Sequence, residues 1–179
     1  MRVPGLARPG EWRFDALEDL PDDVNRYEVV DGNLVVTPPP TEFHVVVQRI
    51  LQRAIEASMP QGWEIYIDFP VRMGTDGRIA DLALVQLDVV PTSRLRNTTR
   101  LDQLGLIVEV VSPSSRKTDR FAKPGEYAEA GIPNYWRVES DPEPRLHSYV
   151  LHDGAYVETA EPQLPWGAVT IDLAALGIS

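Results

Sequence analysis

Glu109 is the residue that most constrains how this chain can fold. It interrupts an apolar run, LIVEVV, which extends from Leu106 to Val111. A run that is apolar at successive positions is typical of a strand covered on both faces by other structure. Burying an unpartnered carboxylate there costs several kcal/mol, so Glu109 must be neutral, paired with a cation or bound to a metal ion. A turn at Ser112–Ser115 and a basic helix follow, so we expect cations close to this acid.

A second isolated acid, Asp81, lies in another predicted strand, Ile79–Gln86. A mixed sheet would set this strand beside the Glu109 strand. Paired carboxylates are hard oxygen ligands that suit Mg²⁺ or Mn²⁺, and such an ion can activate water for displacement at the phosphorus of a phosphodiester. The alternative is that each acid accepts hydrogen bonds or pairs with an arginine in the core. The pattern Asp119-x-x-x-Lys123 adds a lysine at helical spacing after the Glu109 strand.

The rest of the pattern predicts an α/β fold. Two β-prone runs flank Asp31-Gly32, which is a strong hairpin signal because glycine tolerates positive φ in a tight turn. Apolar residues recur at helical spacing from Glu42 to Met59, with His44 in the first turn. Further elements are expected as a short helix near Phe14–Leu20, strands at Trp63–Val71, Asn134–Glu139, Arg145–Leu151 and Ala155–Thr159, and a short apolar element within Val169–Leu176. We therefore predict one domain, residues 26–179, with a mixed β-sheet flanked by helices, preceded by an N-terminal arm, residues 1–25.

The composition limits both the chemistry and the compartment. Cysteine is absent, which excludes a cysteine nucleophile and a thiolate zinc site and suits a reducing cytosol. The net charge of −10 argues against non-specific binding of nucleic acid over a broad face, although a local basic cleft is compatible with it. No apolar run approaches the ~20 residues of a membrane span. We therefore expect a soluble, cytoplasmic protein with no membrane partner.

Four segments, taken together and in order, resemble the Uma-two family of restriction-endonuclease-like proteins within the PD-(D/E)XK nuclease superfamily. The segments are YEVVDGNLVVTPPP with the following His44, IADLALV, IVEVVSPSS and DRFAKPGEYAEAGIPNYWRVE. The resemblance covers roughly Arg26 to Glu139. It implies a restriction-endonuclease-like α/β core, a Mg²⁺-dependent nuclease site (or one that uses Mn²⁺) and a homodimer.

The resemblance also implies roles for individual residues. Asp81 matches the first metal-binding acid of the superfamily, Glu109 the second, and Glu28 the acid contributed by the early hairpin. The superfamily usually places a lysine two residues after the second acid, where this chain has Val111. Lys123 is the natural substitute. The usual proline before the first acid is Ala80 here, and Pro124 is expected to start a helix that leaves Lys123 at its N-terminal edge.

Each of these residues also has an ordinary structural interpretation. Glu28 can pair across the hairpin with a cation, and Lys123 can be a surface lysine. Asp119 is better explained as a cap or an ion-pair partner than as a metal ligand. His44 is most simply a structural residue at a helix start, although beside an acid cluster it would contact substrate.

These observations predict a metal-dependent endonuclease that hydrolyses phosphodiester bonds in DNA. Asp81 and Glu109 would bind the ion, Glu28 would assist directly or through water, and Lys123 would position or activate the attacking water. The alternative is a catalytically inactive module of the same fold that binds nucleic acid or assembles with proteins. The lysine missing at Val111 and the acidic composition keep that alternative open.

Overall fold

The computed structural model describes residues 8–21, 23–87, 100–112, 118–139 and 143–174. Its elements in chain order are η1 (Phe14–Asp19), β1 (Arg26–Val30), β2 (Asn33–Thr37), α1 (Glu42–Glu56), β3 (Trp63–Met73), β4 (Asp76–Gln86), η3 (Leu101–Gln103), β5 (Leu104–Val110), η4 (Thr118–Ala122), α2 (Lys123–Glu129), β6 (Asn134–Glu139), β7 (Arg145–His152), β8 (Ala155–Thr159), β9 (Gln163–Leu164) and β10 (Gly167–Ala168). Two compact units divide the chain, residues 1–40 with 70–79 and residues 41–69 with 80–179.

The first unit is built on the hairpin of β1 and β2. The register pairs Val30 with Asn33 across Asp31 and Gly32, whose φ angles are 50° and 69°. Two consecutive positive φ values are typical of the tight primed turns that join hairpin strands. The Asp76 carboxylate accepts hydrogen bonds from the N–H groups of Asp31 at 2.7 Å and Gly32 at 3.2 Å. The hairpin predicted around Asp31-Gly32 is therefore confirmed.

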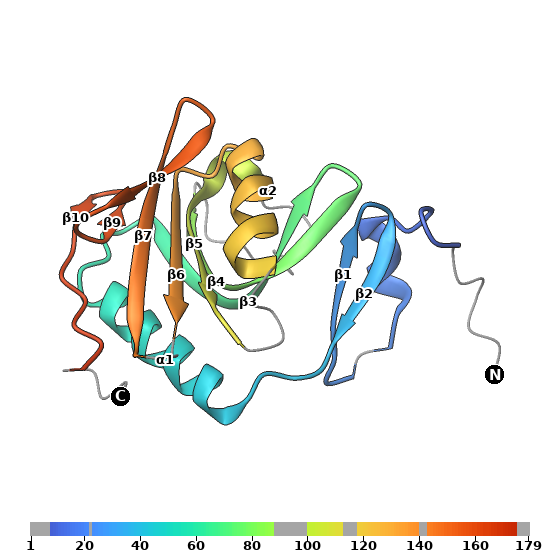
Figure 1. Cartoon of the computed structure of the whole chain (residues 1–179), viewed down its shortest axis with the longest axis horizontal. Coiled ribbons are helices and arrows are strands. Elements are labelled where there is room, and N and C mark those ends of the chain that lie inside the picture. The colour runs from blue at the N-terminus through green and yellow to red at the C-terminus, as the bar shows by residue number, and fades with distance from the viewer. Residues whose placement is uncertain (1–7, 22, 88–99, 113–117, 140–142, 175–179) are drawn as a thin grey trace. The chain divides into compact units, whose positions relative to one another are not determined.

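The second unit contains a mixed sheet with the strand order β4-β5-β6-β7-β8, and β3 pairs with β4 (Figure 1). Strands β5 and β6 are parallel, whereas the pairs β4–β5, β6–β7 and β7–β8 are antiparallel. Parallel neighbours need a crossover connection, and η4 with α2 lies in the segment between β5 and β6. The predicted α/β class, with a mixed sheet flanked by helices, is confirmed.

Helix α1 packs against one face of this sheet. Alternate residues of β4 and β5 share one apolar cluster with the buried face of the helix; the members on these elements are Val47, Leu51, Ile55, Leu82, Leu84, Leu106, Val108 and Val110. Side chains alternate across a strand, so Glu109, between Val108 and Val110, projects from the opposite face. Tyr127 of α2 contacts it there. The sheet thus buries its central acid under α2, away from the apolar core beside α1.

Most predicted elements are confirmed with small changes in their bounds. Helix α1 ends at Glu56 rather than Met59. Helix α2 begins at Lys123 with Pro124 in its first turn, where proline is tolerated because the missing N–H has no intrahelical partner. The short pair β9–β10 was not predicted, and the described residues 169–174 contain no helix or strand. The turn predicted at Ser112–Ser115 lies outside the described residues, except for Ser112 itself. None of the helices in the described ranges is long and apolar enough to cross a membrane.

Candidate active site

Asp81 lies on β4 and is almost fully buried, with 2% of its surface exposed. The register that pairs Leu82 with Val108 brings it to the end of β5, where its Oδ2 accepts a hydrogen bond from the Val110 N–H at 2.7 Å. Its Oδ1 lies 2.9 Å from Nε2 of His44, which comes from the first turn of α1. The two acid-bearing strands are therefore neighbours, as predicted, and the Asp81 carboxylate lies against the backbone next to Glu109.

Glu109 is 1% exposed and both of its carboxylate oxygens have side-chain donors. The Tyr127 hydroxyl donates to Oε1 at 2.7 Å, and the Lys123 ammonium donates to Oε2 at 2.8 Å. Burial raises the pKa of Glu109 well above its ordinary value. The positive charge of Lys123 opposes this rise in pKa, whereas the negative charges of Asp81 and Asp119 add to it. The three acids therefore lie close enough to repel one another.

Lys123 and Asp119 complete this cluster. Lys123 is the first residue of α2, and its Nζ lies 3.0 Å from Oδ1 of Asp119, four residues earlier on η4. The Tyr135 hydroxyl donates to the Asp119 carbonyl at 2.8 Å and ties η4 to β6. Asp119 Oδ1 is buried and has no well-oriented hydrogen bond within the described part of the chain. Lys123 therefore bridges two carboxylates, and its role in place of a lysine at Val111 stays a prediction.

Gln48 is a site residue that the sequence reasoning missed. Its Nε2 donates to the Asp81 carbonyl at 2.9 Å and to Oδ1 of Asp68 at 3.1 Å. Asp68 has a φ of 53°, an uncommon conformation for a residue other than glycine. Gln48 follows His44 by four residues, so both lie on the same face of α1. This spacing of four residues could have identified Gln48 from the sequence, because it places the glutamine on the same face of the helix as His44.

Glu28 lies in the first unit, whereas the other predicted site residues lie in the second. Its carboxylate accepts hydrogen bonds from Arg78 Nη1 at 3.2 Å and from the Ile79 N–H at 2.8 Å. The side chains of Glu28 and Arg78 are both buried. In the structure Glu28 therefore forms an ion pair, as its structural interpretation expected, and the cation is Arg78.

The donor set of the second unit fits a hard divalent cation. Mg²⁺ typically binds one or two carboxylates and keeps water or phosphate oxygens in its other positions. In the described ranges no three His, Asp or Glu side chains form a ready-made cage, so a site here would be of this open type. His44 Nε2 and Asp119 Oδ1 are both buried without a well-oriented hydrogen bond in the same ranges. Each nevertheless has a charged neighbour, since His44 Nε2 lies 2.9 Å from Asp81 Oδ1 and Asp119 Oδ1 lies 3.0 Å from Lys123 Nζ. The carboxylates of Asp81 and Glu109 are therefore the groups that suit such an ion.

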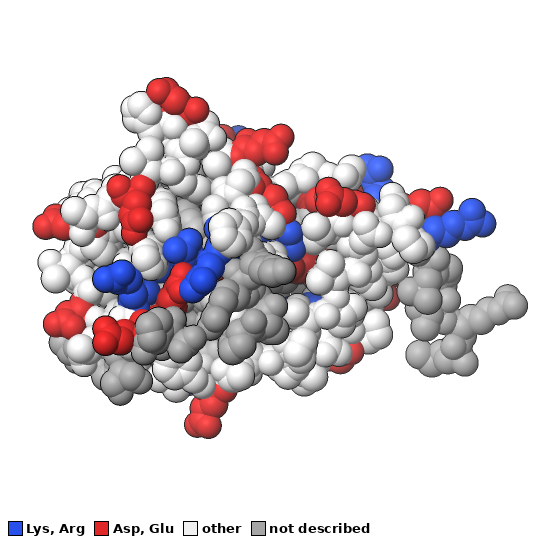
Figure 2. Space-filling model, viewed as in Figure 1, with Lys and Arg blue, Asp and Glu red and all other residues white. Residues whose placement is uncertain are grey.

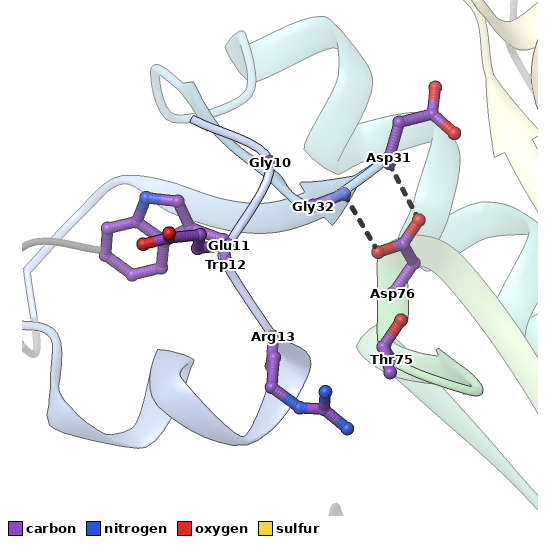
Figure 3. A pocket seen from close by; sticks show the side chains of 8 residues that line it. All are labelled: Gly10, Glu11, Trp12, Arg13, Asp31, Gly32, Thr75 and Asp76. Carbon is purple, nitrogen blue, oxygen red and sulfur yellow. Dashed lines mark hydrogen bonds between the residues drawn. The ribbon is translucent and has the colours of Figure 1, made fainter. Parts of the chain in front are cut away.

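One pocket, of about 270 Å³, lies in the first unit and contains none of the predicted site residues (Figure 3). It is lined by Gly10, Glu11, Trp12, Arg13, Asp31, Gly32, Thr75 and Asp76. The carboxylate of Asp76 turns toward the backbone of the hairpin, where it stabilises the turn. The pocket is therefore part of the scaffold of the hairpin, and the buried acids of the second unit remain the candidate site.

The raised pKa of Glu109 predicts a pH-dependent gain in stability for Glu109→Gln. A group whose pKa is higher in the folded protein than its ordinary value of 4.5 stabilises the fold fully below that value, and this stabilisation is lost as the pH rises through the folded pKa. The difference in unfolding temperature, variant minus wild type, should therefore grow as the pH rises from about 4.5. Thermal unfolding over a pH series measures it. Glu56→Gln, at an exposed position of α1, is the control; equal pH profiles for the two variants would contradict the prediction.

Comparison with known proteins identifies a family and a solved structure of similar fold. Residues 14–172 match the model of the Uma2 family, which is described as "Putative restriction endonuclease". The crystal structure of a "putative nuclease belonging to DUF820" from Anabaena variabilis shares the fold, with a TM-score of 0.66 and 14% identity over 92% of this chain and 96% of that chain. A comparison with curated proteins gives no match. The predicted nuclease-like fold is thus confirmed, and because the family model covers most of its length, the chain belongs to the Uma2 family.

Proposed function

We propose that this protein is a metal-dependent endonuclease that hydrolyses phosphodiester bonds in DNA. The observation that carries the proposal is the meeting of two buried carboxylates from neighbouring strands, Asp81 and Glu109, with the ammonium group of Lys123. Membership of the Uma2 family supports nuclease chemistry. Acids are seldom fully buried without a functional or structural partner, and perturbed carboxyl groups cluster at catalytic sites.

Asp81 and Glu109 would hold the ion, which we propose to be Mg²⁺ or Mn²⁺. When bound, such an ion lowers the pKa of water and neutralises charge on the phosphodiester. Val110 fixes Asp81 through its N–H group, and Gln48 fixes the main chain of the same acid. Tyr127 fixes Glu109. These contacts hold both acids in place before substrate arrives, so little reorganisation is needed during the reaction.

Lys123 would act on the water and on the phosphate. Its ammonium group lies against the carboxylates of Glu109 and Asp119, so it supplies a positive charge beside both acids. In the reaction it would orient the attacking water through a hydrogen bond and offset the negative charge that develops on the phosphate oxygens. His44, which touches Asp81, would contact the substrate from the start of α1. The predicted assistance from Glu28 remains a prediction.

A plasmid assay tests the proposal. The purified protein should convert supercoiled plasmid to nicked or linear forms in the presence of Mg²⁺ or Mn²⁺, and EDTA should stop the reaction until the cation is restored. Calorimetric titration with Mg²⁺ should show binding. If the wild type neither binds the cation nor cuts DNA, the endonuclease proposal fails and the inactive binding module becomes the better interpretation. Size-exclusion chromatography with light scattering would test the predicted homodimer.

A further inference from the structure

A row of side chains runs from the candidate site across the sheet. In the parallel pair of β5 and β6, Glu109 is the register partner of Arg137. In the antiparallel pair of β6 and β7, Arg137 is the partner of His147. Paired residues of neighbouring strands project from the same face, and the strands are ~4.8 Å apart. Arg137 is therefore one strand away from the candidate metal ligand, on the α2 side of the sheet.

Two arginines share one carboxylate beside this row. Arg137 Nε donates to Oε1 of Glu139 at 2.9 Å, and Arg120 Nε, from η4, donates to the same oxygen at 3.0 Å. A second hydrogen bond joins Arg120 Nη2 to Glu139 Oε2. Burial alone would raise the pKa of Glu139, but the hydrogen bond from Arg120 and the positive charges of Arg137 and Arg120 outweigh it, so the pKa lies below its ordinary value. Glu139 thus holds the side chains of Arg120 and Arg137 beside each other.

The two arginine side chains differ in how far they are exposed to solvent. The side chain of Arg120 is 33% exposed and that of Arg137 is 14% exposed, whereas Glu139 is 11% exposed. Arg137 also lies over the ring of Tyr149, 5.5 Å from its centroid, which limits its freedom. Arginine side chains held in place by such contacts lose little entropy on binding, and their planar donors match the oxygens of a phosphate.

The pair stands out against the charge of the rest of the protein. The chain carries 27 acidic and 17 basic residues, so an unselected part of its surface repels DNA. Figure 2 shows acidic side chains scattered over the visible face and a group of Lys and Arg side chains gathered within the second unit. A nuclease of this charge needs a local cationic contact for the substrate backbone, and phosphate contacts of this kind fix register and orientation.

We propose that Arg120 and Arg137, held side by side by Glu139, bind the DNA backbone at phosphates next to the one that is cleaved. This inference rests on the proposed function, because it assigns the pair to the substrate of the same site. Glu139 has two opposing effects in it: the carboxylate orders the two arginines, and its negative charge also competes with the phosphate. Arg120 precedes Lys123 by three residues, so the arginine pair lies near the candidate site.

The experiment measures DNA binding without cleavage. Fluorescence anisotropy of a short fluorescein-labelled DNA duplex, in EDTA, gives Kd over a series of NaCl concentrations. Arg120→Gln and Arg137→Gln should each weaken binding about tenfold and lower the slope of log Kd against log salt by about one. Arg53→Gln, at an exposed position on α1, is the matched control and should bind as the wild type does. Unfolding temperatures confirm that each variant is folded.

Glu139→Gln separates phosphate binding from a purely structural role. Glutamine keeps an oxygen that accepts hydrogen bonds from the arginines but removes the negative charge that competes with the phosphate. The Kd for the DNA duplex should therefore fall by about threefold or more. If the cluster were only a structural ion pair, Glu139→Gln would not tighten binding and the arginine variants would match Arg53→Gln; either result overturns the inference. If the wild type binds DNA through the arginines but does not cut plasmid, the proposed function fails, while the phosphate contacts of the arginine pair stand. Plasmid cleavage with an unchanged KM in both arginine variants overturns the inference alone.

Discussion

Asp81→Asn is expected to reduce metal-dependent DNA cleavage by about 10²- to 10³-fold, the range seen when a preorganised electrostatic contact is removed from an active site. Asparagine keeps the size of the side chain and one oxygen that can accept the hydrogen bond from the Val110 N–H. It loses the negative charge that a hard divalent cation needs. The initial rate of conversion of supercoiled plasmid measures the loss, and calorimetric titration with Mg²⁺ should show weaker binding by the variant.

Asp102→Asn is the control for this experiment. Asp102 lies in the second unit and forms an ion pair with Arg100 in which both side chains are 68% exposed. An exposed pair of this kind contributes little, so its removal should leave both cleavage and cation binding unchanged. The assignment of Asp81 as a ligand is wrong if Asp81→Asn cuts plasmid at the wild-type rate, or if it binds Mg²⁺ as tightly as Asp102→Asn does.

The sequence predicted the parts of this site that depend on local pattern. The apolar run around Glu109 is short and ends at Ser112-Pro113, which favours a buried strand over a buried helix. The same argument places Asp81 in a strand, and the pairing of β4 with β5 then brings the two acids together. The position of Lys123 at the start of α2 also follows from local chemistry, since Pro124 is tolerated only in the first helical turn.

The remaining contacts depend on register and on side-chain reach, which a single sequence does not encode locally. Tyr127 is fully buried, and its hydroxyl donates to Glu109. Glu139 gave no signal, because its partners are Arg137, two residues away, and Arg120, which arrives from η4. The contact of Gln48 with Asp68 joins a helix to a strand twenty residues later. Such contacts are fixed only when the sheet order and the strand registers are known.

Lys123→Met should reduce cleavage by about 10²-fold, because methionine fills a similar volume but removes the positive charge beside Glu109. The same change leaves a buried acid without its cation, so the variant should also be less stable. Measurement of kcat at saturating DNA, with thermal unfolding to show that the variant is folded at the assay temperature, separates the two effects. A Lys123→Met variant that keeps the wild-type kcat would contradict a role for this lysine in the reaction.

A relocated lysine gives a sharper form of this test. Val111 follows Glu109 by two residues, and its N–H continues the pairing with β6 by donating to the Val138 carbonyl at 2.8 Å. Residues two apart on an extended strand project from the same face, so a lysine at this position would approach Glu109 from the strand itself. The double variant Val111→Lys with Lys123→Met should therefore recover about tenfold of the lost rate. That recovery is smaller than the loss because Val111 is buried and a longer side chain must displace its neighbours.

The matched control is Val111→Met with Lys123→Met, which has similar bulk at both positions and no ammonium group. It should remain as slow as Lys123→Met alone. If the two double variants cut DNA equally fast, the recovery comes from repacking and the charge is not the cause. If only the lysine restores the rate, one ammonium group beside Glu109 is sufficient whether it comes from the strand or from the helix. The reaction then depends on the position of the charge in space, which residues 111 and 123 can both supply.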